Sequence, residues 1–296
     1  MRLLRMTGIV LCVGGAGVPA LADDGSGGAE CSVRISAIVG PQQTRIEAVD
    51  DLGAAEHALE PGEAALPEDF AEPLARDGAC RGIEVVRGAT SRRISDAVAA
   101  LFPDGEAVAD VPEEGRLAPG SYEVGPDMTA ADVLAEMQAR QDEILDRAWS
   151  DRADDLPIAS KDEALTLASL VAAEALDDDE ADDIAAVLVN RLREDMKLQT
   201  DPAVIYGASD GLGILEGGLT KDDLQTETPW NTYMIEGLPE SPISNPSEAD
   251  IEAALNPAGG DMLFFVADGA GGHRFSATLE EHEANIRALQ ETAAAE

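Results

Sequence analysis

The stretch LASLVAAEAL, residues 167–176, constrains the fold most, because it predicts a helix that other parts of the chain must cover. Its residues are small and apolar, with one carboxylate. On a helix, Leu167, Leu170, Val171 and Glu174 lie at i, i+3, i+4 and i+7, which is a single face. The only acid of the stretch therefore lies on the face that should be buried. Aromatic residues make up only 3% of the chain, so we expect a core of Ala, Leu, Val and Ile.

The 296 residues are enough for one large domain or two small ones, and 45% of them are apolar. The formal net charge is −39. Such a charge repels polyanions, so we expect neither nucleic acid nor an anionic membrane surface as a partner.

The first 22 residues have the form of a cleavable secretory signal. Two arginines precede an apolar run, residues 6–18, and the sequence Ala-Leu-Ala ends at Ala22. The run is short and rich in glycine for a membrane span, which needs about 20 apolar residues. We therefore expect export to the periplasm. The alternative is an uncleaved anchor in the inner membrane, formed by residues 3–22.

Two cysteines, Cys31 and Cys80, remain after the signal. An even number in an exported protein predicts one disulfide. The alternative is two unpaired, buried thiols.

The N-terminal half predicts a mixture of strands and helices. Alternating residues at 31–40 predict a strand, and a second strand is expected near residue 83. The stretch 50–78 shows no period and predicts mostly loop. Periodic apolar residues predict helices at 91–102 and at 130–149, the second capped by Thr129.

The C-terminal half predicts mainly helices with long loops. Ser160 and Glu163 form a capping pattern before the helix of Glu174, and the acidic stretch 177–183 starts the next helix. Long Gly/Pro-rich loops follow, then a β-hairpin and a C-terminal helix from about Leu279. We therefore expect an α+β fold with four parts. These are the signal (1–22), an acidic extension with the disulfide (23–82), a small α/β domain (83–155) and a mainly helical domain (156–296).

Several kinds of site are not expected from the sequence. The mature chain has no phosphate-binding glycine loop and no serine elbow, and His273 and His282 are not spaced as zinc ligands. We expect neither a metal nor a cofactor.

Glu174 itself has two interpretations. It can be a glutamate at a helix end that reaches water or pairs with Arg191. Alternatively, an apolar environment raises its pKa, so that it holds a proton near neutral pH and donates it to a leaving oxygen. Cleavage of glycosidic bonds is a common use of such an acid.

From about residue 83 to 290 the chain resembles the endolytic murein transglycosylases, the YceG-like family of the bacterial envelope. Four segments carry the resemblance in the same order as in the family. They are LTLASLVAAEA, VLVNRLREDMKLQTDPAVIYG, TPWNTYMIEGLPESPISNPSEADIEAALNP and LFFVADGAGGHRFSATLEEHEANI. RLAPGSYEV and the helix after it are similar to the family's LysM-like N-terminal part.

The resemblance implies a lyase that cuts the bond between N-acetylmuramic acid and N-acetylglucosamine in peptidoglycan without water, leaving an anhydro-muramic end. Glu174 occupies the place of the family's catalytic acid. Further residues match positions in the family's motifs, and we expect them to bind the glycan, with a turn or capping role as the alternative for each. They are Glu180, Asn190, Gln199, Asp201, Tyr206, Asn231, Tyr233 and Asn245.

The chain departs from the family pattern at a few positions. Ala172 stands in place of a glutamate, Trp230 of a tyrosine, Ser247 of a glycine and Glu283 of an asparagine. A peptidoglycan-binding relative without activity is therefore an alternative, as is a hydrolase on the same fold. The expected partners are peptidoglycan strands and cell-wall synthases, and we expect a monomer.

Overall fold

The computed structural model confirms the α+β class. It describes residues 31–50, 53–60, 66–67, 70, 72, 79–102, 108, 110–175 and 178–293. The predicted signal, residues 1–22, lies outside these ranges. Among the described helices, none combines the length and the hydropathy that crossing a lipid bilayer requires.

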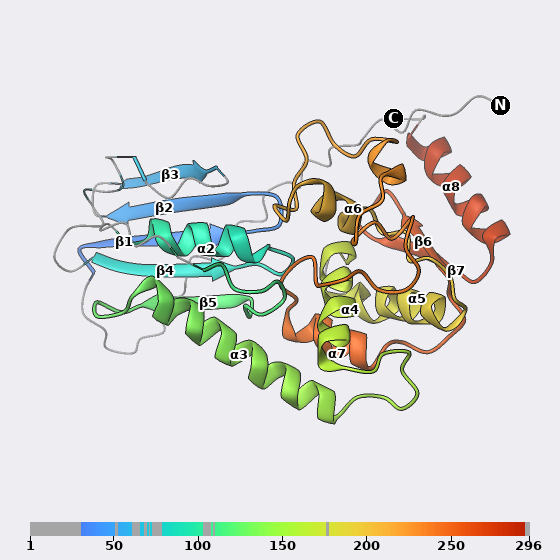
Figure 1. Ribbon diagram of the computed structural model, residues 1–296. Helices are drawn as coiled ribbons and strands as arrows, with labels where there is room; N and C mark the ends of the chain where they lie inside the picture. Colours follow the sequence, from blue (N-terminus) through green and yellow to red (C-terminus); the bar gives the residue numbers. More distant parts are fainter. Residues whose placement is uncertain are drawn as a thin grey trace.

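The N-terminal half is built on a five-stranded sheet with the order β3-β2-β1-β4-β5 (Figure 1). Strand β1 pairs in parallel with β4 and antiparallel with β2, and the two outer pairs are antiparallel. The strands are β1 (Val33–Val39), β2 (Thr44–Asp50), β3 (Gly53–Leu59), β4 (Ala79–Val85) and β5 (Gly120–Val124).

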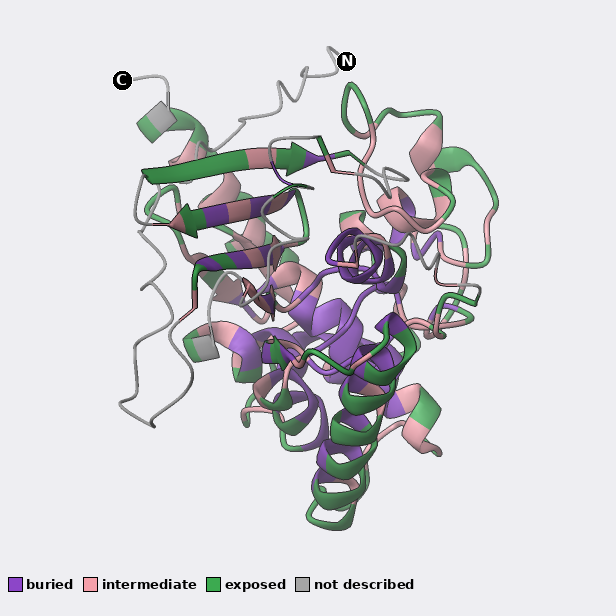
Figure 2. Cartoon of the chain, turned by 90° about the vertical axis from the view of Figure 1, so that its left-hand side faces the viewer, coloured by how far each residue is buried: buried purple, intermediate pink, exposed green. Residues whose placement is uncertain are grey.

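Strand β3 corrects the expectation of loop after residue 50. It pairs with β2 along its whole length, but most of its residues are exposed because it lies at the edge of the sheet. Figure 2 shows this edge strand as mostly exposed. A strand that is not covered on either face needs no alternation of apolar residues, so the sequence carries no period there.

The predicted disulfide is confirmed. Cys31 and Cys80 are bonded, with their Cα atoms 5.6 Å apart. Cys80 lies in β4 and Cys31 lies just before β1. The bond therefore ties the start of the described chain to the neighbouring parallel strand.

The two predicted helices are present and cover one side of the sheet. Helix α2 (Ser91–Ala100) packs on β1 and β4, and α3 (Ala130–Ser150) packs against α2 (Figure 1). Thr129 and Asp132 form the capping box of α3. The first half of α3 packs in the core of the sheet, whereas its second half packs in a separate core with the C-terminal helices.

The C-terminal half surrounds α4 with helices and a small hairpin. Its elements are α4 (Lys161–Glu174), η1 (Asp178–Glu180), α5 (Ala181–Arg193), α6 (Asp201–Ala208), η2 (Asp223–Gln225), α7 (Glu248–Leu255), β6 (Phe264–Ala267), β7 (His273–Ser276) and α8 (Leu279–Ala293). Helix α4 packs against α3, α5, α6 and α7. The predicted hairpin (β6 and β7) and the C-terminal helix (α8) are both present.

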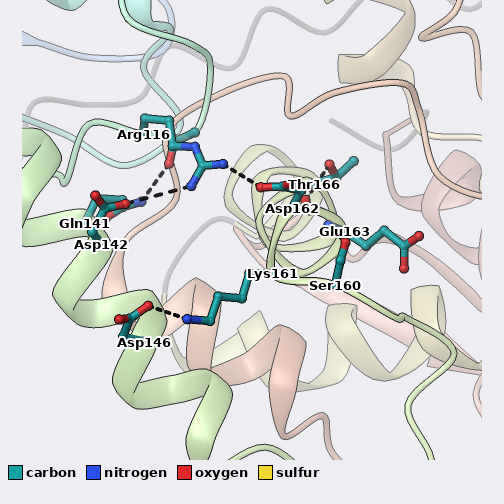
Figure 3. Close-up of polar contacts among 10 residues, drawn as sticks. Arg116, Gln141, Asp142, Asp146, Ser160, Lys161, Asp162, Glu163 and Thr166 are labelled. Atoms are coloured by element: carbon teal, nitrogen blue, oxygen red, sulfur yellow. Dashed lines mark hydrogen bonds and ion pairs between the residues drawn. The ribbon is translucent and has the colours of Figure 1, made fainter.

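Polar contacts join the two halves beside α3 (Figure 3). Arg116 forms ion pairs with Asp142 on α3 and with Asp162 on α4, and Lys161 pairs with Asp146. The fully buried amide of Gln141 donates to the carbonyls of Gly115 and Pro246. A further ion pair, between Arg87 and the buried Asp250, joins the segment after β4 to α7.

The division of the chain at residues 82 and 155 stays a prediction. Strand β4 contains residues on both sides of 82, and the end of α3 packs with helices that follow 155. Packing therefore does not separate the halves at these two positions.

Candidate active site

Glu174 is the last residue of α4 and lies on the predicted face. Leu167, Leu170 and Val171 are fully buried, whereas Glu174 is partly buried. The helix ends there because Ala175 adopts an extended conformation, with ψ 129°. The carboxylate therefore lies at the edge of a helix whose apolar part is enclosed.

The surroundings of Glu174 favour its protonated form. Burial and, to a smaller extent, the negative charge of Asp201 raise the pKa of Glu174 to about 8, although the charge of Arg191 opposes the shift. The C-terminal end of a helix also disfavours a negative charge. A carboxyl group with this pKa holds its proton at neutral pH.

Arg191 does not pair with Glu174. Its guanidinium donates to three backbone carbonyls instead, those of Leu263 (2.7 Å), Leu198 (2.8 Å) and Lys197 (3.3 Å). Within the described parts of the chain, the carboxylate of Glu174 has neither an ion pair nor a hydrogen bond. The geometry does not support the interpretation of Glu174 as the partner of Arg191.

Asp201 and Tyr233 form a pair near Glu174. The hydroxyl of Tyr233 donates to Asp201 Oδ1 over 2.6 Å. Burial, and then this bond to Asp201, raise the pKa of Tyr233. Asp201 is exposed and begins α6, a helix that the sequence did not predict because Pro202 and Gly207 are typical of loops.

Gln199 precedes α6 with an unusual backbone conformation. Its φ is +53°, in the left-handed region, while its side chain is exposed. The other described residues with positive φ are glycines and aspartates, which tolerate this region better. Thr232 fixes the segment: its carbonyl accepts from Gln199 N–H, and its Oγ1 accepts from Thr200 N–H. Strained residues of this kind concentrate at functional sites.

Three other predicted site residues are engaged by the protein itself. The fully buried Asn231 contacts the carbonyls of Asp223 and Thr226 and the N–H of Tyr233. Asn190 donates to the carbonyls of Gly260 and Met262. The carboxylate of Glu180 accepts from the backbone N–H of His273 (2.6 Å) and contacts its Nδ1 (2.9 Å). These contacts hold the loop before Tyr233 and the hairpin in place.

Tyr206 and Asn245 both contact a residue that the sequence analysis missed, Glu114. Its Oε1 accepts from the amide of Asn245 (3.0 Å) and from the N–H of Ser91 (2.7 Å). Its Oε2 accepts from the hydroxyl of Tyr206 over 3.3 Å. Burial raises the pKa of Glu114 to about 7, although the hydrogen bonds oppose this shift.

Comparison with known proteins gives the family of the chain. The model of the YceG-like family matches residues 35–288, which is most of the chain. The chain belongs to the YceG-like family.

Curated relatives carry a name that describes an activity. This YceG-like chain is 36% identical over 172 residues to an endolytic murein transglycosylase of Bacillus subtilis, a match of 58% of this chain and 46% of that protein. It is 34% identical over 179 residues to an endolytic murein transglycosylase of Streptococcus pneumoniae, covering 58% of this chain and 31% of that protein. The chain thus spans less than half the length of these relatives.

A solved structure supports the fold. The chain is similar to a yceG-like protein of Listeria monocytogenes, with a TM-score of 0.59 and 28% identity. The similarity covers 78% of this chain and 84% of that one.

Three of the residues expected to depart from the family pattern have local contacts in the structure. Ser247 caps α7 in a capping box with Asp250. Trp230 donates from its indole N–H to Ser241 and lies edge-on to Tyr206, with ring centroids 5.5 Å apart. Ala172 is buried, and its carbonyl faces the Gly88 turn.

No group of His, Cys, Asp and Glu suited to a metal ion occurs among the residues that the structure describes. Glu114 gave no signal in the sequence, because it is one of 59 acidic residues. Its partners Ser91, Tyr206 and Asn245 lie 23 to 131 positions away.

Proposed function

We propose that this YceG-like chain is a lytic transglycosylase that cuts the bond between N-acetylmuramic acid and N-acetylglucosamine in peptidoglycan. The observation that carries the proposal is the carboxyl group of Glu174. It ends a buried helix, its pKa is raised to about 8, and no described residue forms an ion pair or a hydrogen bond with it. The names of the relatives from Bacillus subtilis and Streptococcus pneumoniae support the same activity.

One acid is sufficient for this reaction. Protonated Glu174 donates its proton to the glycosidic oxygen while the bond between that oxygen and the anomeric carbon breaks. The carboxylate then accepts the proton of the muramic acid's own hydroxymethyl group, whose oxygen bonds to the anomeric carbon. Glu174 is thereby protonated again, and no water is consumed. A glycoside hydrolase, by contrast, commonly uses a pair of carboxylates.

We divide the remaining predicted site residues by their contacts. The exposed Gln199 and Asp201 and the partly exposed Tyr206 and Tyr233 are proposed to contact sugar hydroxyls and amides. The others, Glu180, Asn190, Asn231 and Asn245, are proposed to support the site by holding its loops, because their polar groups are already engaged.

A peptidoglycan substrate supports a location outside the cytoplasm. We propose export to the periplasm by the signal at residues 1–22, with an anchor at residues 3–22 as the alternative. N-terminal sequencing of the exported protein distinguishes the two: a chain that begins after Ala22 supports cleavage, and one that begins at Met1 supports the anchor. A role beside cell-wall synthases, ending the growth of glycan strands, fits this location.

The direct test is mass analysis of purified peptidoglycan after incubation with the protein. Anhydro-muramic ends support the proposal. Reducing ends without an anhydro ring would instead indicate a hydrolase. Glycan binding with no product would indicate a binding protein without activity.

A further inference from the structure

Glu114 belongs to the N-terminal half but lies against residues of the C-terminal half. It lies between α2 and β5 in the chain, and its neighbour Gly115 packs closely against Pro242. Its two oxygens have different partners. Oε1 accepts from Ser91 and Asn245, whereas Oε2 accepts from the hydroxyl of Tyr206.

Tyr206 is held on three sides. Trp230 contacts its ring edge-on. A Cβ added at Gly211 would lie 3.3 Å from its hydroxyl oxygen, so there is little room on that side. On the third side, Glu114 accepts the hydrogen bond that the hydroxyl of Tyr206 donates. Tyr206 is partly exposed in this position.

We propose that Glu114 is a positioning residue that fixes the direction of the Tyr206 hydroxyl, so that its oxygen accepts a hydrogen bond from an N–H or O–H donor of the glycan. A phenol has one proton to donate and lone pairs with which to accept. When the phenol donates its O–H to the carboxylate of Glu114, the phenol oxygen can only accept a hydrogen bond from the substrate. The N-acetyl N–H of the sugars is a donor of the matching kind. This inference rests on the function proposed above.

The proposal also predicts a dependence on pH. Once Glu114 is protonated, it can donate to Tyr206, and the phenol is then free to donate instead of accept. Tyr206 is the titratable group in direct contact with Glu114. Of the charged neighbours in sequence, Glu113 is exposed, and Arg116 pairs with Asp142 and Asp162. Because the pKa of Glu114 is about 7, the change falls in an accessible range.

The consequence is that the site in the C-terminal half is incomplete without residues of the N-terminal half. Glu114 also accepts from the backbone N–H of Ser91 at the start of α2, and the N–H of Leu117 donates to Asn245. Elements of both halves therefore determine the orientation of one side chain near the site.

The test compares four full-length variants with wild type: Glu114→Gln, Tyr206→Phe, the double variant, and Glu113→Gln. The last is a matched control, because it removes the same charge from the adjacent, exposed residue. The measurements are kcat and KM for release of anhydro-muramic ends between pH 5 and 9, glycan binding, and the thermal midpoint.

We expect Glu114→Gln to lower kcat/KM about tenfold or more at pH 8, the range of one hydrogen bond to a charged group. The wild-type rate should rise with pH near 7 as Glu114 loses its proton and fall near pH 8 as Glu174 loses its own. The rise should be absent from Glu114→Gln and Tyr206→Phe, whereas the fall should remain. The kcat/KM of the double variant should equal that of the less active single variant, because both changes remove the same contact. Glu113→Gln should behave as wild type.

Three results would overturn the inference: a wild-type rate and pH profile for Glu114→Gln, additive losses in the double variant, or a lower thermal midpoint with unchanged kinetics. If Glu114→Gln does not fold, Tyr206→Phe carries the test, because its rise near pH 7 should still vanish. A wild-type protein that releases no anhydro ends would refute the proposed function and this inference with it, whereas an active wild type with an unaffected Glu114→Gln refutes the inference alone.

Discussion

Replacing Glu174 by glutamine should remove activity and, above neutral pH, make the protein more stable. Glutamine has nearly the same shape but cannot transfer a proton. General acid–base assistance is worth about 10²–10⁴ in rate, and Glu174 serves both steps, so the loss should reach at least that range. Glycan binding should remain, because no cavity forms and no charge loses its partner.

The stability change follows from the raised pKa of Glu174. The ordinary value is 4.5 and the folded value is about 8, so the folded state holds the proton more tightly than the unfolded state. This contribution to stability is fully present below about pH 4.5 and is lost as the pH rises through 8. A shift of this size corresponds to at most about 5 kcal/mol. Because Glu174 is partly exposed, water screens part of the effect, and we expect about 2–4 kcal/mol.

The assay is denaturant unfolding of both proteins at pH 5 and pH 9, beside the release of anhydro-muramic ends. The two proteins should have similar free energies of unfolding at pH 5, and the glutamine variant should be the more stable at pH 9. Glu194→Gln is the matched control: Glu194 caps the C-terminus of α5 and is exposed, so both properties should stay close to wild type. Equal activity in folded Glu174→Gln would show that Glu174 is only a helix-end glutamate. Equal free energies of unfolding of the two proteins at pH 9 would show that burying the charge of Glu174 does not destabilise the fold.

Two further predictions follow from the backbone and the disulfide. Gln199→Gly should relieve the left-handed conformation and leave stability unchanged or about 1 kcal/mol higher, while activity falls; unchanged activity would mean that the side chain does not contact the glycan. Cys80→Ser removes a bond across a sequence separation of 49 and should cost about 4 kcal/mol by loop-closure entropy, seen as a lower thermal midpoint. The same midpoint in wild type and variant, both measured without reductant, would contradict this.

Most of the helices could be predicted because their signals are local, and the disulfide could be predicted because the exported chain has only two cysteines. Glu174 lies on the face that its spacing from Leu167 indicates, and the capping box of Thr129 begins α3 as expected. The pairing of Cys31 with Cys80 required only an even number of cysteines in an exported chain. In each case the residues that determine the structure are close in sequence or few in number.

The remaining features depend on contacts between distant residues. Strand β3 forms because β2 offers an edge, and nothing in its own composition indicates a strand. Helix α6 forms despite Pro202, which at the first turn of a helix costs no hydrogen bond. Glu114 contacts Tyr206 and Asn245 only in the folded chain, and no local sequence pattern predicts these contacts.

Helix α3 has a consequence for how the molecule unfolds. At 21 residues it is about 30 Å long, and it supplies apolar side chains to two cores at once. If the N-terminal half unfolded alone, α3 would lose the packing that orders its first turns. Fraying of the helix would then reach the turns that contain Ile144 and Leu145. We therefore expect the two cores to unfold in one cooperative transition, seen as a single calorimetric peak on heating.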